Sequence, residues 1–182
     1  MKRISRKLFW VWDFDKEEKW LNEMSEKGLQ LTAVGFCKYV FEEGTPGEYG
    51  IRLELLENWP TSPESVRYIK FVEDTGAEYI GSVLRWVYFR KKNTGGTGFD
   101  LFFDVDSRIK HLNRILAMIV LLGILELYGG VWNSLSGYFS SRSPVSMFLG
   151  ILNTLLGILI VYGFVRIYGK MTRLKKEREL HE

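Results

Sequence analysis

The sequence predicts an α+β domain with a ferredoxin-like, split βαβ order, followed by a transmembrane helical hairpin. Three observations predict this class. Strand and helix patterns alternate through residues 1–93, and two long apolar stretches follow. Cations cluster before the first of these stretches and after the second. The expected order in the domain is strand, helix, strand, strand, helix, strand (β-α-β-β-α-β). We therefore expect a four-stranded antiparallel sheet with both helices on one face.

The first three elements follow from local patterns. Residues 8–12 form a continuous apolar and aromatic run, which predicts a buried strand. Residues 15–18, Asp-Lys-Glu-Glu, have the form of a capping box that opens a helix, and Gly28 stands where a helix would end. Residues 29–42 alternate between apolar and polar side chains and predict one long strand.

The second three elements repeat this order of types. Residues 49–55 alternate and predict a half-buried strand. Ser62 and Pro63 are typical of the first positions of a helix, which Gly76 would end. Residues 79–90 predict the last strand. We expect no internal sequence repeat.

Two apolar stretches of membrane length follow the domain. Residues 115–132 contain one charged side chain and residues 147–165 contain none. A helix of about 20 such residues crosses the hydrocarbon core of a bilayer. Two buried helices of a globular core are the alternative, but core helices of this length normally have a polar face.

The positions of the cations predict the orientation. Residues 1–107 contain 15 Lys and Arg against 18 Asp and Glu, whereas residues 108–182 contain 10 against 4. The connection between the spans has one cation, Arg142, and the other cations of this half flank the spans. The positive-inside rule then predicts a two-pass plasma-membrane protein with both termini in the cytoplasm. The tail is expected to attract anionic inner-leaflet lipid at about 1 kcal/mol per cation, through Arg166, Lys170, Arg173, Lys175 and Lys176.

Four regions are therefore expected. They are a cytoplasmic domain (1–93), a Gly-rich joint with a juxtamembrane amphipathic segment (94–113), a transmembrane hairpin (114–168) and a basic cytoplasmic tail (169–182).

Glu126 is the most informative residue of the hairpin, because a carboxylate within a span is costly and suggests a function. Asn153 and Thr154 lie at nearly the same depth in the second span. We predict that these side chains hold the two helices together by hydrogen bonds. The alternative is a proton or ligand site, or a contact with a partner's span.

Aromatic side chains in the domain suggest an interaction surface. The predicted strands contain more aromatics than one helix-covered face would hold, so some are expected on an open sheet face: Trp10, Trp12, Trp86 and Tyr88. An open apolar face suggests self-association, a partner protein or the bilayer surface.

We find no pattern of catalytic or cofactor chemistry. Cys37 is the sole cysteine and is expected to be a core thiol, and neither His111 nor His181 has neighbours at metal-ligand spacing. No phosphate loop or dinucleotide fingerprint is present. The strand YGIRLELL does not match an RNA-binding motif. We therefore expect no enzyme activity, no cofactor, no metal and no nucleic-acid partner.

Several segments together resemble one family. KLFWVWDFDKEEKWLNEMSEKG, SPESVRYIKFVEDTGAEYIGSVLRWVYFRK and FFDVDSRIKH are similar to the bacterial domain-of-unknown-function family twenty-eight-twelve, over residues 5–115. The resemblance implies a protein of Gram-positive bacteria with C-terminal transmembrane helices, often encoded beside PadR-like repressors. It implies a regulated membrane protein that answers envelope stress or a toxic compound, and it transfers no catalytic residue.

These observations favour a non-enzymatic, membrane-anchored regulatory or adaptor protein whose cytoplasmic domain binds a protein or a small ligand. The alternative is a small transport or immunity component whose hairpin assembles with itself or with another membrane protein.

Overall fold

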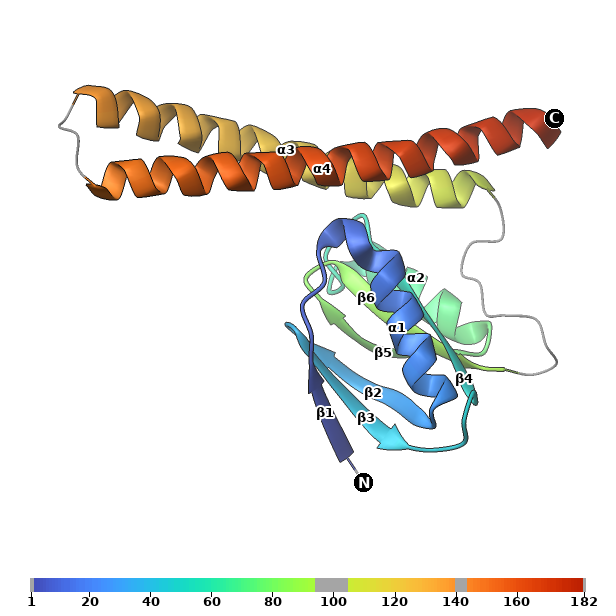
Figure 1. The fold of residues 1–182 in the computed structure, drawn as a ribbon. Helices are drawn as coiled ribbons and strands as arrows, with labels where there is room; N and C mark the ends of the chain where they lie inside the picture. The colour runs from blue at the N-terminus through green and yellow to red at the C-terminus, as the bar shows by residue number, and fades with distance from the viewer. Residues whose placement is uncertain (1, 94–104, 140–143, 182) are drawn as a thin grey trace. The chain divides into compact units, whose positions relative to one another are not determined.

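The computed structural model describes residues 2–93, 105–139 and 144–181 (Figure 1). The chain divides into two compact units, Met1–Asp104 and Val105–Glu182. Most of the predicted joint and the connection residue Arg142 lie outside the described residues.

The first unit contains two three-stranded antiparallel sheets. One has the strand order β1-β3-β2 and the other β4-β6-β5. The strands are β1 (Lys2–Arg6), β2 (Leu29–Gly35), β3 (Lys38–Glu43), β4 (Tyr49–Leu55), β5 (Ala77–Val83) and β6 (Trp86–Lys92). The helices are the short 3-10 helix η1 (Val11–Asp13), α1 (Phe14–Glu26) and α2 (Pro63–Asp74).

Two predicted long strands are hairpins. The prediction for residues 29–42 was wrong because β2 and β3 are joined by a turn at Phe36 and Cys37. The prediction for residues 79–90 was wrong for the same reason, with the turn at Leu84 and Arg85. Tight hairpin turns are normally marked by Gly, Asn or Asp. Here the left-handed positions are occupied by Cys37 (φ 52°) and Leu84 (φ 55°), so the usual signal is missing.

The two halves of the unit have the same plan, strand-helix-strand-strand. β5 begins 48 residues after β2 (77 against 29), and β6 begins 48 residues after β3 (86 against 38). Gly28 and Gly76 both adopt positive φ in the position after a helix C-cap residue, which matches the prediction for these glycines. The register shifts at Leu31/Ala33 and Tyr79/Gly81 are also 48 residues apart. The two halves therefore repeat one structural plan, which no sequence repeat had indicated.

The two helices lie on opposite faces of the second sheet. Val87 and Phe89 on β6 join the core cluster that contains Ile69 and Val72 of α2. Tyr88, between them in sequence, joins the cluster that contains Leu21 of α1. Because successive side chains of a strand point to opposite faces, the two helices cover different faces. The α+β class is confirmed, whereas a single four-stranded sheet with both helices on one face is not observed.

α1 connects the two sheets through a shared apolar core. Leu21 is fully buried, and its cluster combines Leu31 and Phe41 of the first sheet with Ile51 and Leu53 of the second. α2 begins as predicted, because the Ser62 Oγ accepts a hydrogen bond from the Ser65 N–H at 3.3 Å. α1 has no such side-chain cap at its N-cap residue Asp13, so the capping box expected at residues 15–18 does not open it.

The second unit is an antiparallel pair of long helices, α3 (Val105–Phe139) and α4 (Pro144–His181) (Figure 1). Both extend beyond the predicted spans, and α4 includes the predicted basic tail as far as His181. A Cβ added at Gly123 would lie 3.4 Å from Ile160 Cγ2, and one at Gly130 would lie 3.0 Å from Asn153 Nδ2. Small residues therefore allow the two helices to approach closely at these positions.

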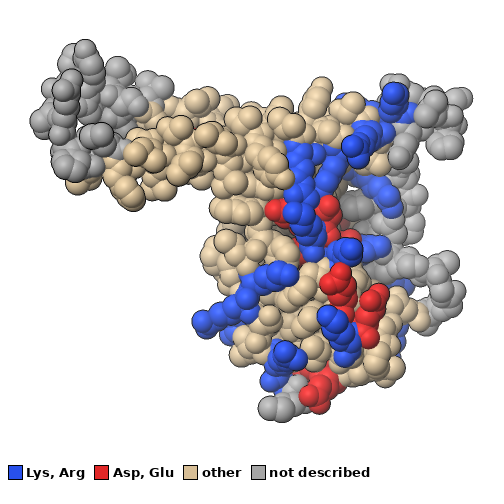
Figure 2. Space-filling model, viewed as in Figure 1, with Lys and Arg blue, Asp and Glu red and all other residues tan. Residues whose placement is uncertain are grey.

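Large apolar side chains cover the outside of this helix pair. Residues 108–130 and 148–176 each form a helix that is long and apolar enough to cross a membrane. The described part of the pair shows little Lys, Arg, Asp or Glu over much of its length in Figure 2. The exposed large apolar side chains include Leu121, Ile124, Leu125, Leu127, Phe148, Ile151, Leu155, Ile158, Val161 and Val165.

Candidate functional site

The most distinctive polar group in the domain is a buried carboxylate, that of Glu17. It lies on the apolar face of α1, one turn before Leu21. Its Oε1 accepts a hydrogen bond from the hydroxyl of Tyr39 at 2.7 Å and from the hydroxyl of Tyr88 at 2.6 Å. Tyr39 belongs to β3 and Tyr88 to β6, so one oxygen joins α1 to both sheets.

Burial changes the acid-base properties of all three groups. Loss of water contacts raises the pKa of Glu17, and the two hydrogen bonds only partly oppose this. Burial, followed by the nearby charge of Glu17, raises the pKa of both Tyr39 and Tyr88. The phenols therefore remain protonated donors. The arrangement can hold a proton on Glu17 and fix the sheets, but it presents no activated nucleophile.

An aromatic cluster lies beside this carboxylate. Trp20 packs edge-on against Tyr39, with ring centroids 5.0 Å apart, and against Phe41 at 5.8 Å. Phe9 contacts Trp20 at 5.7 Å. The Lys7 ammonium lies over the rings of Trp20 and Phe9, at 4.7 and 4.8 Å from their centroids. This cation–π contact holds the segment after β1 against α1.

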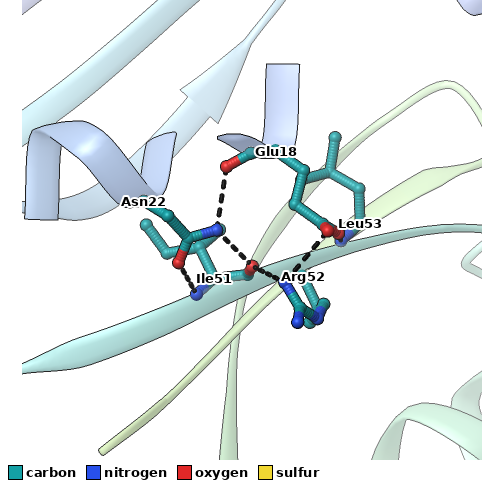
Figure 3. Close-up of polar contacts among 5 residues, drawn as sticks. All are labelled: Glu18, Asn22, Ile51, Arg52 and Leu53. Atoms are coloured by element: carbon teal, nitrogen blue, oxygen red, sulfur yellow. Dashed lines mark hydrogen bonds and ion pairs between the residues drawn. The ribbon is translucent and has the colours of Figure 1, made fainter. Parts of the chain in front are cut away.

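α1 also binds the backbone of the edge strand β4 (Figure 3). The Asn22 side chain accepts from the Ile51 N–H and donates to the Ile51 carbonyl, both at 2.9 Å. The Glu18 carboxylate accepts from the Leu53 N–H at 3.0 Å and pairs with the Arg52 guanidinium at 3.0 Å. Side chains of α1 thus form hydrogen bonds with backbone groups that an edge strand would otherwise leave without partners. We assign this contact a structural role.

In the helix pair, Glu126 Oε1 and Asn153 Nδ2 are buried polar atoms without a hydrogen-bond partner among the described residues. Asn153 faces Gly130, one helical turn along α3 from Glu126. The Thr154 hydroxyl donates to the Gly150 carbonyl of its own helix at 2.9 Å. The predicted bond from Thr154 to Glu126 is therefore not observed, and neither is one from Asn153 Nδ2 to Glu126 Oε1.

The predicted lipid-facing cations all lie on α4. Arg173, Lys175 and Lys176 are exposed, whereas Arg166 and Lys170 are half-buried. Arg166, Lys170 and Arg173 are spaced by one helical turn each and share a side of the helix. Their contact with lipid stays a prediction.

The predicted open aromatic face does not form. Residues 8–12 are not a strand, because β1 lies earlier, at Lys2–Arg6. Trp10 stacks on Trp12 with ring centroids 5.4 Å apart, and Trp12 is buried. Tyr88 is 4% exposed and bonded to Glu17, and Trp86 stacks on Phe14 at 5.6 Å. Trp12, Trp86 and Tyr88 pack within the domain, since α1 covers the face of β6 on which Tyr88 lies, whereas Trp10 is 45% exposed.

Sequence reasoning missed Glu17 and Tyr39. A signal was present, because Glu17 lies three and four residues before the apolar Trp20 and Leu21, which places it on the buried face of the helix. Cys37 was expected in a strand interior but lies half-buried in the β2–β3 turn. Among the described residues, no group of three or more His, Cys, Asp or Glu side chains could hold a metal.

Comparison with known proteins gives a family and no further relative. Neither the curated proteins nor the solved structures contain a match to this chain. Residues 13–124 match the family described as Protein of unknown function (DUF2812). The match begins at Asp13, passes through the domain and continues into α3. Because it covers more than half of the chain, this protein belongs to the DUF2812 family.

Proposed function

We propose that this chain is a non-enzymatic, membrane-anchored regulatory or adaptor protein. Two passes would anchor it in the plasma membrane with both termini in the cytoplasm, and its domain would bind a protein or a small ligand. The observation that carries the proposal is the helix pair, whose apolar side chains are exposed along α3 and α4. Such a surface is stable in lipid and would aggregate in water.

The orientation is supported by charge. Arg108, Lys110 and Arg114 lie at the start of α3, and the tail cations lie at the end of α4. Because the helices are antiparallel, both groups lie at the same end of the pair. The positive-inside rule places that end in the cytoplasm.

The buried polar groups of the domain are engaged in structural contacts, which favours a non-enzymatic role in this proposal. Its buried carboxylate, Glu17, accepts two tyrosine hydroxyls, and Glu18 and Asn22 bind the backbone of β4. These polar groups hold elements together. The link to envelope stress and PadR-type regulation in Gram-positive bacteria rests on the family resemblance alone.

Cross-linking in native membranes tests this proposal. Amine-reactive cross-linking of the tagged full chain, followed by extraction in mild detergent, should give a reproducible partner or a second copy joined to lysines of residues 2–93. A Glu126→Gln chain serves as the matched variant and should retain the same cross-links. Finding only monomeric, uncross-linked chain in both would overturn the binding of a protein partner or a second copy by the domain.

A second candidate function is favoured by Glu126 and Asn153. Buried polar atoms without partners are rare and call for an explanation, such as a contact with another membrane segment. The chain would then be a small transport or immunity component whose hairpin assembles with itself or another membrane protein. In that case Glu126→Gln should abolish both activity and membrane-embedded cross-links while leaving abundance unchanged.

A further inference from the structure

We propose that the end of the domain formed by the β2–β3 and β5–β6 turns docks on an anionic phospholipid surface. We call this end the hairpin tip; it comprises Arg6, Leu8, Phe36, Lys38 and Leu84. The proposal goes beyond the helix anchor, because it assigns a second, peripheral lipid contact to the domain itself.

The two turns lie side by side because β2 and β5 run in the same direction (Figure 1). Arg90 Nη1 donates to the Leu31 carbonyl at 2.8 Å, and Arg90 is opposite Glu78 in the sheet. Further along, a Cβ added at Gly81 would lie 3.1 Å from Val34 Cγ2. Residues 31–34 of β2 therefore run beside residues 78–81 of β5 in the same direction. The turns that come next, at 36–37 and 84–85, lie at the same end of the domain.

Each turn exposes a large apolar side chain. Phe36 is 81% exposed and Leu84 is 65% exposed. Leu8 is also exposed, and it follows Lys7, whose N–H donates to the Cys37 carbonyl at 3.2 Å. The three apolar side chains therefore lie on neighbouring segments at one end. Single exposed apolar residues are ordinary, but a group of three at a tip indicates an interaction surface.

The backbone gives a second reason to regard these turns as specialised. Leu84 and Cys37 adopt left-handed φ values, which a side chain other than Gly, Asn or Asp rarely does. A Gly at either position would remove this strain. Retaining a leucine with positive φ at an exposed turn is explained if its side chain is used outside the domain.

Charge identifies the surface that the tip fits. Residues 5–12, 33–40 and 81–88 hold the two turns, the ends of β2, β3, β5 and β6 beside them and the end of β1. These segments contain Arg6, Lys7, Lys38 and Arg85 and no Asp or Glu. Arg6 and Lys38 are exposed and lie opposite each other on β1 and β3. Figure 2 shows Lys and Arg over the end of the domain at which Figure 1 places the β2–β3 turn. Apolar side chains beside cations are typical of surfaces that bind an anionic bilayer. Each cation there raises the binding constant about fivefold.

Cys37 offers a direct probe because it is the sole cysteine and lies in the tip. The full chain is labelled at Cys37 with an environment-sensitive fluorophore. It is then reconstituted in nanodiscs of phosphatidylcholine, with or without about one third phosphatidylglycerol. Quenching by lipids that carry a spin label near the headgroup reports contact between tip and bilayer. We expect strong quenching in the anionic discs and several-fold weaker quenching in the neutral discs.

Matched variants separate apolar insertion from charge. Leu84→Ser and the pair Arg6→Glu, Lys38→Glu should each reduce quenching in anionic discs at least about fivefold. Phe71→Ser and Lys70→Glu, at exposed positions of α2, are the controls and should not change it. A second label at Leu84→Cys in a Cys37→Ser chain, combined with Phe36→Ser, guards against an effect of the first label. Unchanged tryptophan emission would verify that each variant is folded.

Equal quenching in neutral and anionic discs, or no loss in the tip variants relative to the α2 controls, would overturn the inference. Its failure is distinguishable from failure of the proposed anchor. A chain that does not enter nanodiscs at all contradicts the anchor, whereas a chain that enters without tip quenching contradicts the docking surface alone.

Discussion

The domain and the helix pair treat the same kinds of side chain in opposite ways. In the domain, Leu21 and Phe41 are fully buried in a core shared by two sheets. In the helix pair, Leu125 and Leu127 are 60% and 71% exposed. Water drives apolar residues inward in the first unit. The helices of the second unit are long and apolar enough to cross a membrane, and in the proposed anchor lipid would accept these side chains on the outside of the pair.

Polar groups differ in the same sense. The domain pairs its buried Glu17 with two hydroxyls, while Glu126 Oε1 and Asn153 Nδ2 in the helix pair lack hydrogen-bond partners within the described residues. Packing in the pair relies on close approach at Gly123 and Gly130 instead.

The largest expected contrast comes from equal truncations in the two units. Leu21→Ala should lower the free energy of unfolding of the domain by about 2–5 kcal/mol, because it leaves a cavity in the shared core. Leu125→Ala should change it by less than about 0.5 kcal/mol. Urea unfolding of the full chain in mild detergent, followed by tryptophan emission, measures both. Similar losses in the two variants would show that Leu21 and Leu125 contribute alike to the stability of the domain.

The contact between α1 and β4 should give the next largest effect. Asn22→Ala leaves the N–H and carbonyl of Ile51 without their side-chain partner and should cost about 1–3 kcal/mol. Asn22→Asp keeps the acceptor and loses the donor. Its loss in free energy of unfolding should therefore be smaller than that of Asn22→Ala but greater than zero. The same unfolding measurement applies. An unchanged free energy of unfolding in Asn22→Ala would show that water replaces this contact.

The buried carboxylate should make stability depend on pH. The pKa of Glu17 is raised in the folded domain, so the folded state binds a proton more tightly than the unfolded state. Its contribution is therefore fully favourable below the ordinary value of about 4.5 and is lost as pH rises through the raised value. Stability of the native chain should decline over that interval.

Glu17→Gln is the control for this pH effect. Its amide oxygen can accept from Tyr39 and Tyr88, which both donate to Oε1 in the native chain, but it carries no titrating proton. Urea midpoints are measured from pH 4 to pH 8. As pH rises, the stability of the Glu17→Gln chain should increase relative to that of the native chain. Parallel curves would contradict the assignment.

The smallest effect is expected from the amide in the helix pair. If Asn153 only packs against α3, Asn153→Leu should change the stability of the pair by less than about 1 kcal/mol, because its Nδ2 has no partner among the described residues. Thermal melting in detergent, followed by circular dichroism, measures this. A large loss of cellular activity with normal melting would instead favour the transport or immunity function.

The sequence was sufficient to predict the elements whose signals are local. Ser62 and Pro63 marked the start of α2, Gly28 and Gly76 marked helix ends, and the two apolar stretches marked α3 and α4. The hairpins were missed because Cys37 and Leu84 take left-handed positions that normally belong to glycine or asparagine. Treating each hairpin as one long strand hid the repeat of the two halves and led to the wrong sheet.

For the polar sites too, the one with a local signal in the sequence was predicted and the one without was missed. Glu126 stood out because a charge within an apolar run is visible locally. The cluster of Glu17, Tyr39 and Tyr88 joins residues 22 and 71 positions apart, so no local pattern could reveal it. Tyr88 was placed on an open face because nothing local indicated that α1 covers that side of β6.

The most direct test of the account is the membrane topology of the intact chain. A membrane-impermeant maleimide is applied to whole cells that express either the native chain, with its sole Cys37, or a Cys37→Ser chain with Ser141→Cys in the connection. If both termini lie in the cytoplasm, Ser141→Cys should be labelled from outside, and Cys37 should be labelled only after the cells are permeabilised. Labelling of Cys37 in intact cells, or release of the chain from membranes by alkaline carbonate, would contradict this topology.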